Sequence, residues 1–331
     1  MSALFTTDTI GIFLEKTAEK HPDHEFIVFP GLEVRWSFAV FNERVDRLAR
    51  GLLQIGIVPR DHIGIWANNL PDWLTFFFAA AKIGAVLVPL NTYFKRHDVE
   101  YVIADSDIKA LVFVDHFRNS NYREILLELI PEMPDSIPGQ LKSERFPKLR
   151  TLIHLGTENY PGMFNTEELL RLGENFSEPE YRKIVNTVSC HDVVNIQYTS
   201  GTTGFPKGVM LTHHNILNNG YYIGECQRFT QNDRLCLPVP LFHCFGISLG
   251  VMAALTHATT LVFLENFDPT KVLTTVQEEK CTALYGVPAM FFAELSLPEL
   301  HCTDLSSLRT GIMAGAPCPM KPCVRSWKKC R

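Results

Sequence analysis

The residues best suited to chemistry in this sequence form a loop rich in glycine and hydroxyl groups. The loop reads Tyr198-Thr199-Ser200-Gly201-Thr202-Thr203-Gly204-Phe205-Pro206-Lys207-Gly208. Its glycines permit positive φ angles and bring backbone N–H groups close to an anion. The hydroxyls of Ser200, Thr202 and Thr203 add hydrogen-bond donors, and Lys207 adds a full positive charge. Together these groups predict a clamp for a polyphosphate.

The loop differs from the Walker A motif, in which a lysine directly follows the second glycine and a helix begins at once. Here Lys207 comes after Gly204-Phe205-Pro206, and a strand-like run, Val209-Met210-Leu211, follows it. Pro206 restricts its own φ and biases Phe205 toward extended geometry, which limits collapse of the loop without ligand. An ordinary surface hairpin is the alternative. About eight specified positions make a chance match rare, on the order of 10⁻⁷ from average residue usage.

Three later segments add candidate residues. Pro240-Leu241-Phe242-His243-Cys244-Phe245-Gly246 places a histidine among aromatic residues, although a lone histidine there is usually a core residue. Tyr285-Gly286-Val287-Pro288 is predicted to end a strand and open a helix, with the proline in the first turn; a plain turn with apolar packing is the alternative. Met313-Ala314-Gly315-Ala316-Pro317-Cys318-Pro319 has small residues that let a flat ring approach the backbone.

The elements that must position these segments alternate between strand and helix, which predicts an α/β fold with largely parallel sheets. Residues 73–90 are nearly all apolar, but the change from Phe/Ala-rich to β-branched predicts a buried helix and strand rather than a membrane span. Residues 131–148 are predicted to form a surface loop. We expect strands at 25–29, 63–67, 85–90, 110–114, 151–155, 193–198, 234–237, 260–262 and 283–285, and helices at 10–20, 37–53, 73–83, 97–104, 166–172 and 269–280.

Composition narrows the partners. The chain has 331 residues, 46% of them hydrophobic, and a formal net charge of -5, which makes nucleic acid or an anionic membrane an improbable main partner. The nine cysteines form no C-x-x-C pair, and residues 1–15 carry no targeting signal, so we expect a cytoplasmic protein. The pair His213-His214 has no carboxylate at ligand spacing, and no metal site is expected there.

At the phosphate loop the sequence resembles the adenylate-forming superfamily, which contains acyl-CoA synthetases, luciferases and peptide-synthetase adenylation domains. The resemblance extends from about Thr9 to Met320. It implies the N-terminal large domain of that fold, with two stacked α/β subdomains at residues 1–191 and 192–320, helices around largely parallel sheets, and an incomplete C-terminus.

The resemblance implies an AMP-forming acid–CoA ligase. Such an enzyme uses ATP with Mg²⁺ to convert a carboxylic acid to an acyl-adenylate and then transfers the acyl group to coenzyme A. The sequence at 91–101 and 240–246 is most similar to the branch of the family that activates fatty acids with medium to long chains. An aromatic-acid ligase and a non-catalytic nucleotide-binding module are the alternatives.

The resemblance also implies roles for individual residues. The expected nucleotide contacts are Thr199, Ser200, Gly201, Thr202, Thr203, Gly204, Lys207, Gly208, Gly315, Ala316 and Pro317. The expected acid-pocket residues are His243, Phe245, Tyr285, Gly286, Val287 and Pro288. Lys207 and His243 are the expected catalytic residues, and His243 would orient the substrate rather than transfer a proton.

The resemblance stops after Met320. The family's Tyr-Gly-x-Thr-Glu and Thr-Gly-Asp segments and its late lysine are absent from this sequence, so we expect the chain to be inactive alone. The tail, residues 321–331, contains a proline, two cysteines and five basic residues. One set of codons that can encode this tail, with a single base added in front, would instead encode Glu-Ala-Val-Arg-Glu-Val-Met-Glu-Lys-Met. This peptide reads as the start of an amphipathic helix. We therefore expect a one-base deletion after the Met320 codon; a true or alternatively spliced C-terminus is the alternative.

Overall fold

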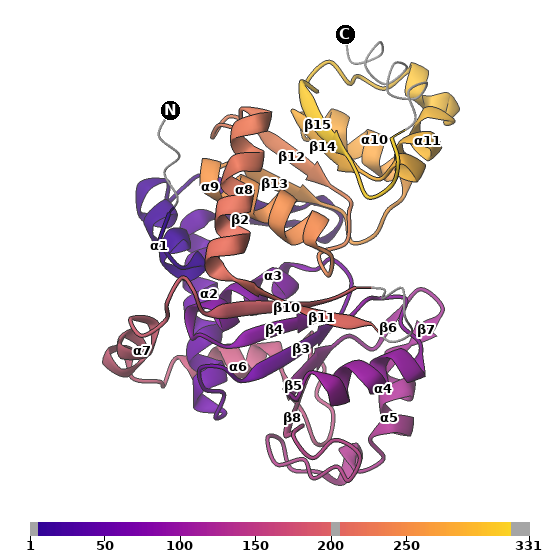
Figure 1. Ribbon diagram of the computed structural model, residues 1–331. Helices are drawn as coiled ribbons and strands as arrows, with labels where there is room; N and C mark the ends of the chain where they lie inside the picture. The colour runs from indigo at the N-terminus through magenta and orange to yellow at the C-terminus, as the bar shows by residue number, and fades with distance from the viewer. Residues whose placement is uncertain (1–5, 200–205, 319–331) are drawn as a thin grey trace. The chain divides into compact units, whose positions relative to one another are not determined.

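The computed structural model describes residues 6–199 and 206–318. These residues form two α/β units (Figure 1). Unit 1 comprises the described residues up to Glu15 and the segment Asn42–Asn215, whereas unit 2 comprises Lys16–Phe41 and the described residues from Ile216 onward. The tail expected at 321–331 lies outside the described residues.

Unit 1 is built on a seven-stranded sheet with the strand order β11-β10-β4-β3-β5-β8-β9. All neighbours in it are parallel except β10 and β11, which are antiparallel. Parallel strands covered on both faces are apolar throughout, and β4 is accordingly buried at all four positions. The strands are β3 (His62–Trp66), β4 (Val86–Pro89), β5 (Ile108–Phe113), β8 (Thr151–His154), β9 (Phe164–Asn165), β10 (Val193–Thr199) and β11 (Lys207–Thr212).

Two helices of unit 1 begin directly after an asparagine that caps them. Asn121 accepts the Glu124 N–H at 3.1 Å to start α5, and Asn165 accepts the Glu168 N–H at 2.8 Å to start α6. The helices are α3 (Pro71–Lys82), α4 (Arg96–Asp105), α5 (Tyr122–Leu129), α6 (Thr166–Gly173) and α7 (Glu178–Val185), with the 3₁₀ turn η2 (Met133–Asp135) and the hairpin of β6 (His116–Phe117) and β7 (Ser120–Asn121).

The apolar stretch at 73–90 forms helix α3 and strand β4, as expected. Every residue of α3 except Asp72 is buried, so the helix has no solvent-facing side. Within the described part of the chain, no helix is long and apolar enough to cross a membrane.

Unit 2 is built on a six-stranded sheet with the order β15-β14-β12-β13-β1-β2, parallel except for β1 and β2. One face of it packs on a cluster of buried residues that includes Cys236, Val272 and Leu284. The strands are β1 (Glu25–Phe29), β2 (Val34–Ser37), β12 (Arg234–Leu237), β13 (Thr260–Phe263), β14 (Ala283–Gly286) and β15 (Thr310–Met313). The helical elements in this part of the chain are η1 (Pro30–Leu32), the π-helix η3 (Phe245–Val251), α9 (Met252–His257), α10 (Pro269–Glu278), α11 (Pro288–Leu295) and η4 (Pro298–His301).

Three helices contain residues of both units: α1 (Ile10–Lys20), α2 (Phe38–Gln54) and α8 (His213–Gln227). Thr9 Oγ1 accepts the Ile12 N–H at 3.2 Å at the start of α1. Ser37 caps α2, because its hydroxyl accepts the Val40 N–H at 3.3 Å.

The structure divides the chain differently from the boundary expected at residue 192. Strand β10 belongs to unit 1, because Asn195 pairs with Leu87 of β4 in a parallel register. Residues 16–41 belong to unit 2, because Ile27 of β1 pairs with Leu261 of β13. Both pairings join segments that are far apart in the sequence.

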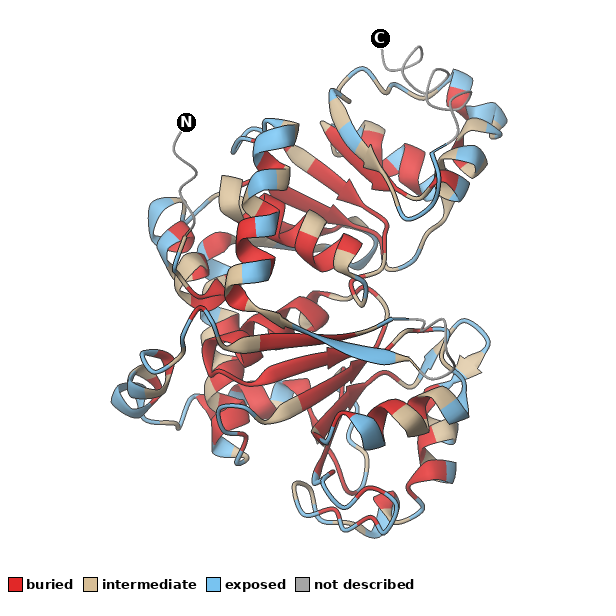
Figure 2. Cartoon of the chain, viewed as in Figure 1, coloured by how far each residue is buried: buried red, intermediate tan, exposed pale blue. Residues whose placement is uncertain are grey.

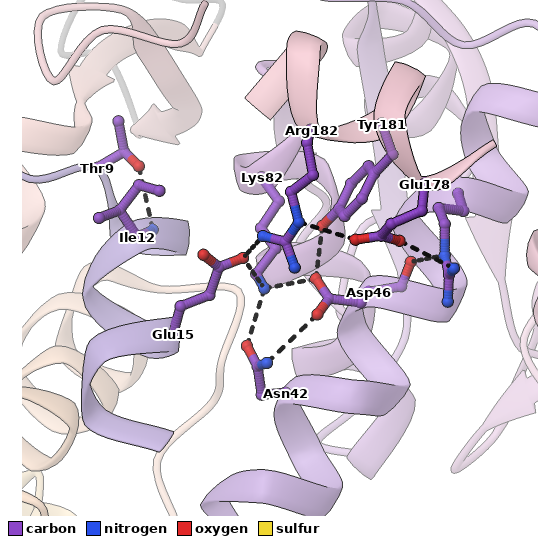
Figure 3. A network of polar contacts seen from close by, with 10 residues as sticks. Thr9, Ile12, Glu15, Asn42, Asp46, Lys82, Glu178, Tyr181 and Arg182 are labelled. Carbon is purple, nitrogen blue, oxygen red and sulfur yellow. Dashed lines mark hydrogen bonds and ion pairs between the residues drawn. The ribbon is translucent and has the colours of Figure 1, made fainter. Parts of the chain in front are cut away.

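A buried lysine joins three helices of unit 1 (Figure 3). The Lys82 side chain is fully buried, and its Nζ donates to Asn42 Oδ1 at 2.8 Å, Glu15 Oε1 at 2.8 Å and Asp46 Oδ1 at 2.5 Å. Tyr181 of α7 also donates to Asp46, at 2.5 Å. The ammonium group therefore joins α1, α2 and α3, and the Tyr181 hydroxyl connects α7 to Asp46 in the same network.

Candidate active site

The expected phosphate loop begins and ends at the carboxyl edge of the unit 1 sheet. Strand β10 ends at Thr199, β11 begins at Lys207, and these two residues face each other in the antiparallel pair. Because β10 is parallel to β4, this edge also carries the C-terminal ends of β4, β3, β5 and β8. Ligands of open α/β sheets bind at this edge. The location agrees with an anion-binding role for the loop.

Both ends of the loop are held by helix α4. The Tyr198 hydroxyl donates to Asp105 Oδ2 at 2.6 Å, and the Tyr101 hydroxyl donates to the Pro206 carbonyl at 3.2 Å. Burial, and then the bond to Asp105, raise the pKa of Tyr198, so its hydroxyl remains a donor. Roles for Tyr101 and Asp105 were not predicted from the sequence. Their spacing of four residues on one helix face was the available signal.

Gly208 is required by this packing. A Cβ atom at this position would lie 2.9 Å from Cγ2 of Ile196 and 3.3 Å from Cζ of Tyr198. A side chain here would therefore push against the ring that holds the end of β10. The glycine supports the loop through close packing, beyond the backbone freedom expected from the sequence.

Lys207 is exposed at the start of β11, which is itself largely solvent-exposed (Figure 2). In the ranges 6–199 and 206–318, no carboxylate forms an ion pair with it. Its ammonium group can therefore serve a bound anion without first breaking an internal salt bridge. The other expected phosphate contacts, Ser200, Gly201, Thr202, Thr203 and Gly204, lie outside the described residues.

The expected acid-pocket residues and the expected nucleotide contact Gly315 lie at the carboxyl edge of the unit 2 sheet. His243 lies in the connection that follows β12, Tyr285 and Gly286 end β14, and Gly315 follows β15. Strand β14 is parallel to both β12 and β15, so the three segments leave neighbouring strands at the same edge. The sequence spaces these segments at least 29 residues apart, and the sheet brings them together.

The two residues that follow His243 orient its ring. Its Nδ1 accepts the Phe245 N–H at 3.2 Å, and the Cys244 thiol lies 3.5 Å from the same nitrogen. Desolvation lowers the pKa of the ring, although the side chain stays accessible to solvent. A neutral ring that accepts at Nδ1 carries its proton on Nε2. His243 thus presents a hydrogen-bond donor, which suits orientation of a carboxylate.

The segment after His243 enters a helix of the π type, which the sequence did not predict. A Cβ atom at Gly246 would lie 2.3 Å from the carbonyl oxygen of Pro240, so only glycine fits this turn. Isolated π-helical turns are found frequently at functional sites. Phe245 is buried at its start.

Tyr285, Val287 and Pro288 form the strand-to-helix turn that was expected. Val287 is the N-cap of α11 and Pro288 its first residue. Tyr285 is fully buried, with its ring 5.8 Å from that of Phe245. Gly286 leaves room for Phe291, whose Cε2 would lie 3.0 Å from a Cβ atom at this position.

The expected adenine-contact segment is exposed after β15. Gly315 has a φ of +84°, which favours glycine, and a Cβ atom there would lie 3.1 Å from Cγ1 of Val287. Ala316 and Pro317 are exposed beside it. A flat ligand could therefore approach this backbone from the solvent side.

The described part of the chain holds no group of three or more histidine, cysteine or acidic side chains placed to bind a metal ion. His213 has an internal role. Its Nδ1 accepts the Ile10 N–H at 3.2 Å, and burial lowers the pKa of the ring to about 4. The ring is thus a neutral core residue that joins α8 to α1.

Comparisons with known proteins define the class. The family model described as AMP-binding enzyme matches residues 14–331, and the chain belongs to this family. It is 48% identical over 311 residues to the putative acyl-CoA synthetase YngI of Bacillus subtilis, covering 94% of this chain and 57% of that protein. It is 39% identical over 317 residues to the mitochondrial medium-chain acyl-CoA ligase ACSF2 of Danio rerio, covering 95% of this chain and 52% of that one.

Solved structures agree on the fold. The N-terminal domain of FACL13 from Mycobacterium tuberculosis is 25% identical with a TM-score of 0.78, covering 98% of this chain and 74% of that domain. The anthranilate CoA ligase AuaEII, solved with anthranoyl-AMP, is 21% identical with a TM-score of 0.83, covering all of this chain and 60% of that one, and shows the fold alone. The chain thus spans about half the length of the curated relatives it matches.

Proposed function

We propose that this chain is the ATP- and acid-binding part of an enzyme that joins a carboxylic acid to coenzyme A through an acyl-adenylate. The observation that carries the proposal is Lys207, which lies at the carboxyl edge of the unit 1 sheet opposite Thr199 and makes no ion pair with a described carboxylate. Membership of the AMP-binding family supports it.

In the proposed reaction a carboxylate oxygen attacks the α-phosphorus of ATP. A new P–O bond forms, the bond to the β-phosphate breaks, and pyrophosphate leaves. Lys207 would stabilise the negative charge that builds on the departing phosphates. The Nε2–H of His243 would hydrogen-bond to the acid and orient it. The thiol of coenzyme A then attacks the acyl carbon, and AMP leaves.

The proposed acid is a medium- to long-chain fatty acid. The ACSF2 relatives of several vertebrates, at 37 to 39% identity, are named medium-chain acyl-CoA ligases, which supports this class over an aromatic acid. Mg²⁺ accompanies ATP in the proposal. No cluster of metal ligands exists among the described residues, so we assign no residue to it.

Exchange of labelled pyrophosphate into ATP tests the proposal. A protein extended to the length of its relatives should catalyse exchange that depends on octanoate, and the chain of 331 residues alone should not. Exchange by the short chain would contradict its expected inactivity. ATP binding by the extended protein, with no exchange for any fatty or aromatic acid, would favour a nucleotide-binding module. Exchange with benzoate but not octanoate would favour an aromatic-acid ligase.

A further inference from the structure

The side-chain hydroxyl group of Tyr285 is buried. The residue lies at the end of β14, and none of its surface is exposed. In the described part of the chain no atom forms a hydrogen bond with its hydroxyl oxygen. Desolvation, with no opposing contribution, raises the pKa of the phenol, so the hydroxyl keeps its proton and is available as a donor.

The ring of Tyr285 packs against two phenylalanines of unit 2. Its centroid is 5.8 Å from that of Phe245 and 6.4 Å from that of Phe229, and both pairs are stacked. Leu284, the preceding residue, belongs to the core cluster on the other face of the sheet. Tyr285 therefore points away from that core, toward the side where η3 begins.

Phe245 contacts both Tyr285 and His243. The backbone N–H of Phe245 donates to the Nδ1 of His243 at 3.2 Å, so one residue links the histidine and the tyrosine. The connections after β12 and β14 leave neighbouring strands at the same sheet edge. A molecule bound beside His243 is accordingly close to the aromatic cluster of Phe229, Phe245 and Tyr285.

A phenylalanine would suit a purely apolar pocket better than a tyrosine here. The buried hydroxyl was removed from water on folding without a replacement bond, which is unfavourable. Sites that pair a buried polar group with a substrate oxygen discriminate strongly against analogues that lack the oxygen, because the protein group is then left unpaired. An unpaired donor beside an acid pocket is the arrangement that such discrimination needs.

We infer that the acid activated by this protein carries an oxygen substituent, a hydroxyl or oxo group, on its acyl chain, and that Tyr285 donates a hydrogen bond to it. The inference rests on the proposed function, because it takes the acid to bind beside His243. It narrows the substrate from fatty acids in general to oxygenated ones. It makes Tyr285 a residue that determines specificity.

Calorimetric titration of the 331-residue chain tests the inference. The probes are octanoate and a series of octanoates that each carry one hydroxyl, placed at successive carbons. We expect at least one hydroxylated acid to bind roughly tenfold more tightly than octanoate. In Tyr285→Phe this preference should disappear. The variant should melt at the same or a higher temperature, because it removes a group that has no partner.

Tyr122→Phe is the matched control. Tyr122 is equally buried but donates to the Thr92 carbonyl at 2.6 Å in unit 1, so its loss should lower stability and leave the acid preference unchanged. The inference is overturned if octanoate binds as tightly as every hydroxylated acid, or if the preference survives in Tyr285→Phe. If none of the acids binds, the acid pocket of the proposed function is itself wrong.

Discussion

The Tyr198 hydroxyl donates a hydrogen bond of 2.6 Å to Asp105, which connects the end of β10 to the end of α4. The helix thereby holds the strand that leads into the expected phosphate loop. Tyr101, one turn earlier on α4, donates a hydrogen bond to the carbonyl of Pro206, near the C-terminal end of the loop. Both ends of the loop thus depend on one helix.

Removing the first of these contacts should weaken ATP binding. In Tyr198→Phe the ring packing remains, but Asp105 loses its donor, so the loop ends should be held less firmly. We expect affinity for ATP to fall roughly three- to tenfold, which corresponds to about 0.7–1.4 kcal/mol, the size of one typical hydrogen bond. Calorimetric titration measures it, with Tyr221→Phe on α8 as control. Equal affinities in Tyr198→Phe and the unmodified chain would show that α4 does not position the loop.

Lys207→Ala should impair the adenylation step. In a protein extended to the length of its relatives, we expect a loss of about 2–4 kcal/mol of transition-state stabilisation, the size of one charged contact in a preorganised site. Pyrophosphate exchange and the rate of thioester formation from added acyl-adenylate separate the two half-reactions. Lys148→Ala changes an exposed lysine elsewhere in unit 1 and should have no effect. An unchanged exchange rate with slower thioester formation would contradict the assignment.

Lys82→Met should destabilise unit 1 strongly. The substitution removes a fully buried ammonium group and leaves the carboxylates of Glu15 and Asp46 without it, at a cost of about 3–5 kcal/mol. Urea unfolding measures the change. Lys109→Met is the control, because Lys109 pairs with Asp61 at 2.6 Å but is partly exposed, and such pairs contribute about 1 kcal/mol or less. Similar losses in the two variants would show that burial of Lys82 adds nothing.

Glu294 should make stability depend on pH. It is 5% exposed on α11, and burial raises its carboxyl pKa from 4.5 to about 8. At pH values between these two pKa values, the folded chain binds one more proton than the unfolded chain. The free energy of unfolding should therefore fall by about 1.4 kcal/mol for each unit by which the pH rises. This loss of stability is absent at pH values below the unfolded-state pKa and complete at pH values above the folded-state pKa.

Glu294→Gln removes this titration. The variant should gain stability relative to the unmodified chain as the pH rises from 5 to 8, measured by urea unfolding at each pH. Glu299→Gln, on η4, is the control. A constant difference between Glu294→Gln and the unmodified chain across this range would mean that Glu294 is ionised in the folded protein.

Much of the local structure follows from the sequence alone. The expected strand at 25–29 and helix at 10–20 coincide with β1 and α1, because side-chain periodicity and capping groups act over a few residues. The phosphate-binding role of the loop between Thr199 and Lys207 stays a prediction from its residue types, because residues 200–205 lie outside the described residues. Helices α5 and α7 were missed; each is only eight residues long, so the apolar pattern repeats over about two turns and is a weak signal.

Tertiary structure decided which segments meet. Nothing in the local pattern of β1 indicates that Ile27 pairs with Leu261, or that β10 pairs with β4 and so joins unit 1. The sequence also could not show that Lys82 is buried with two carboxylates, or that the buried Tyr285 hydroxyl has no hydrogen-bond partner among residues 6–199 and 206–318. Burial and pairing of this kind depend on contacts between residues far apart in the chain. Local propensities act on neighbouring residues and do not select those contacts.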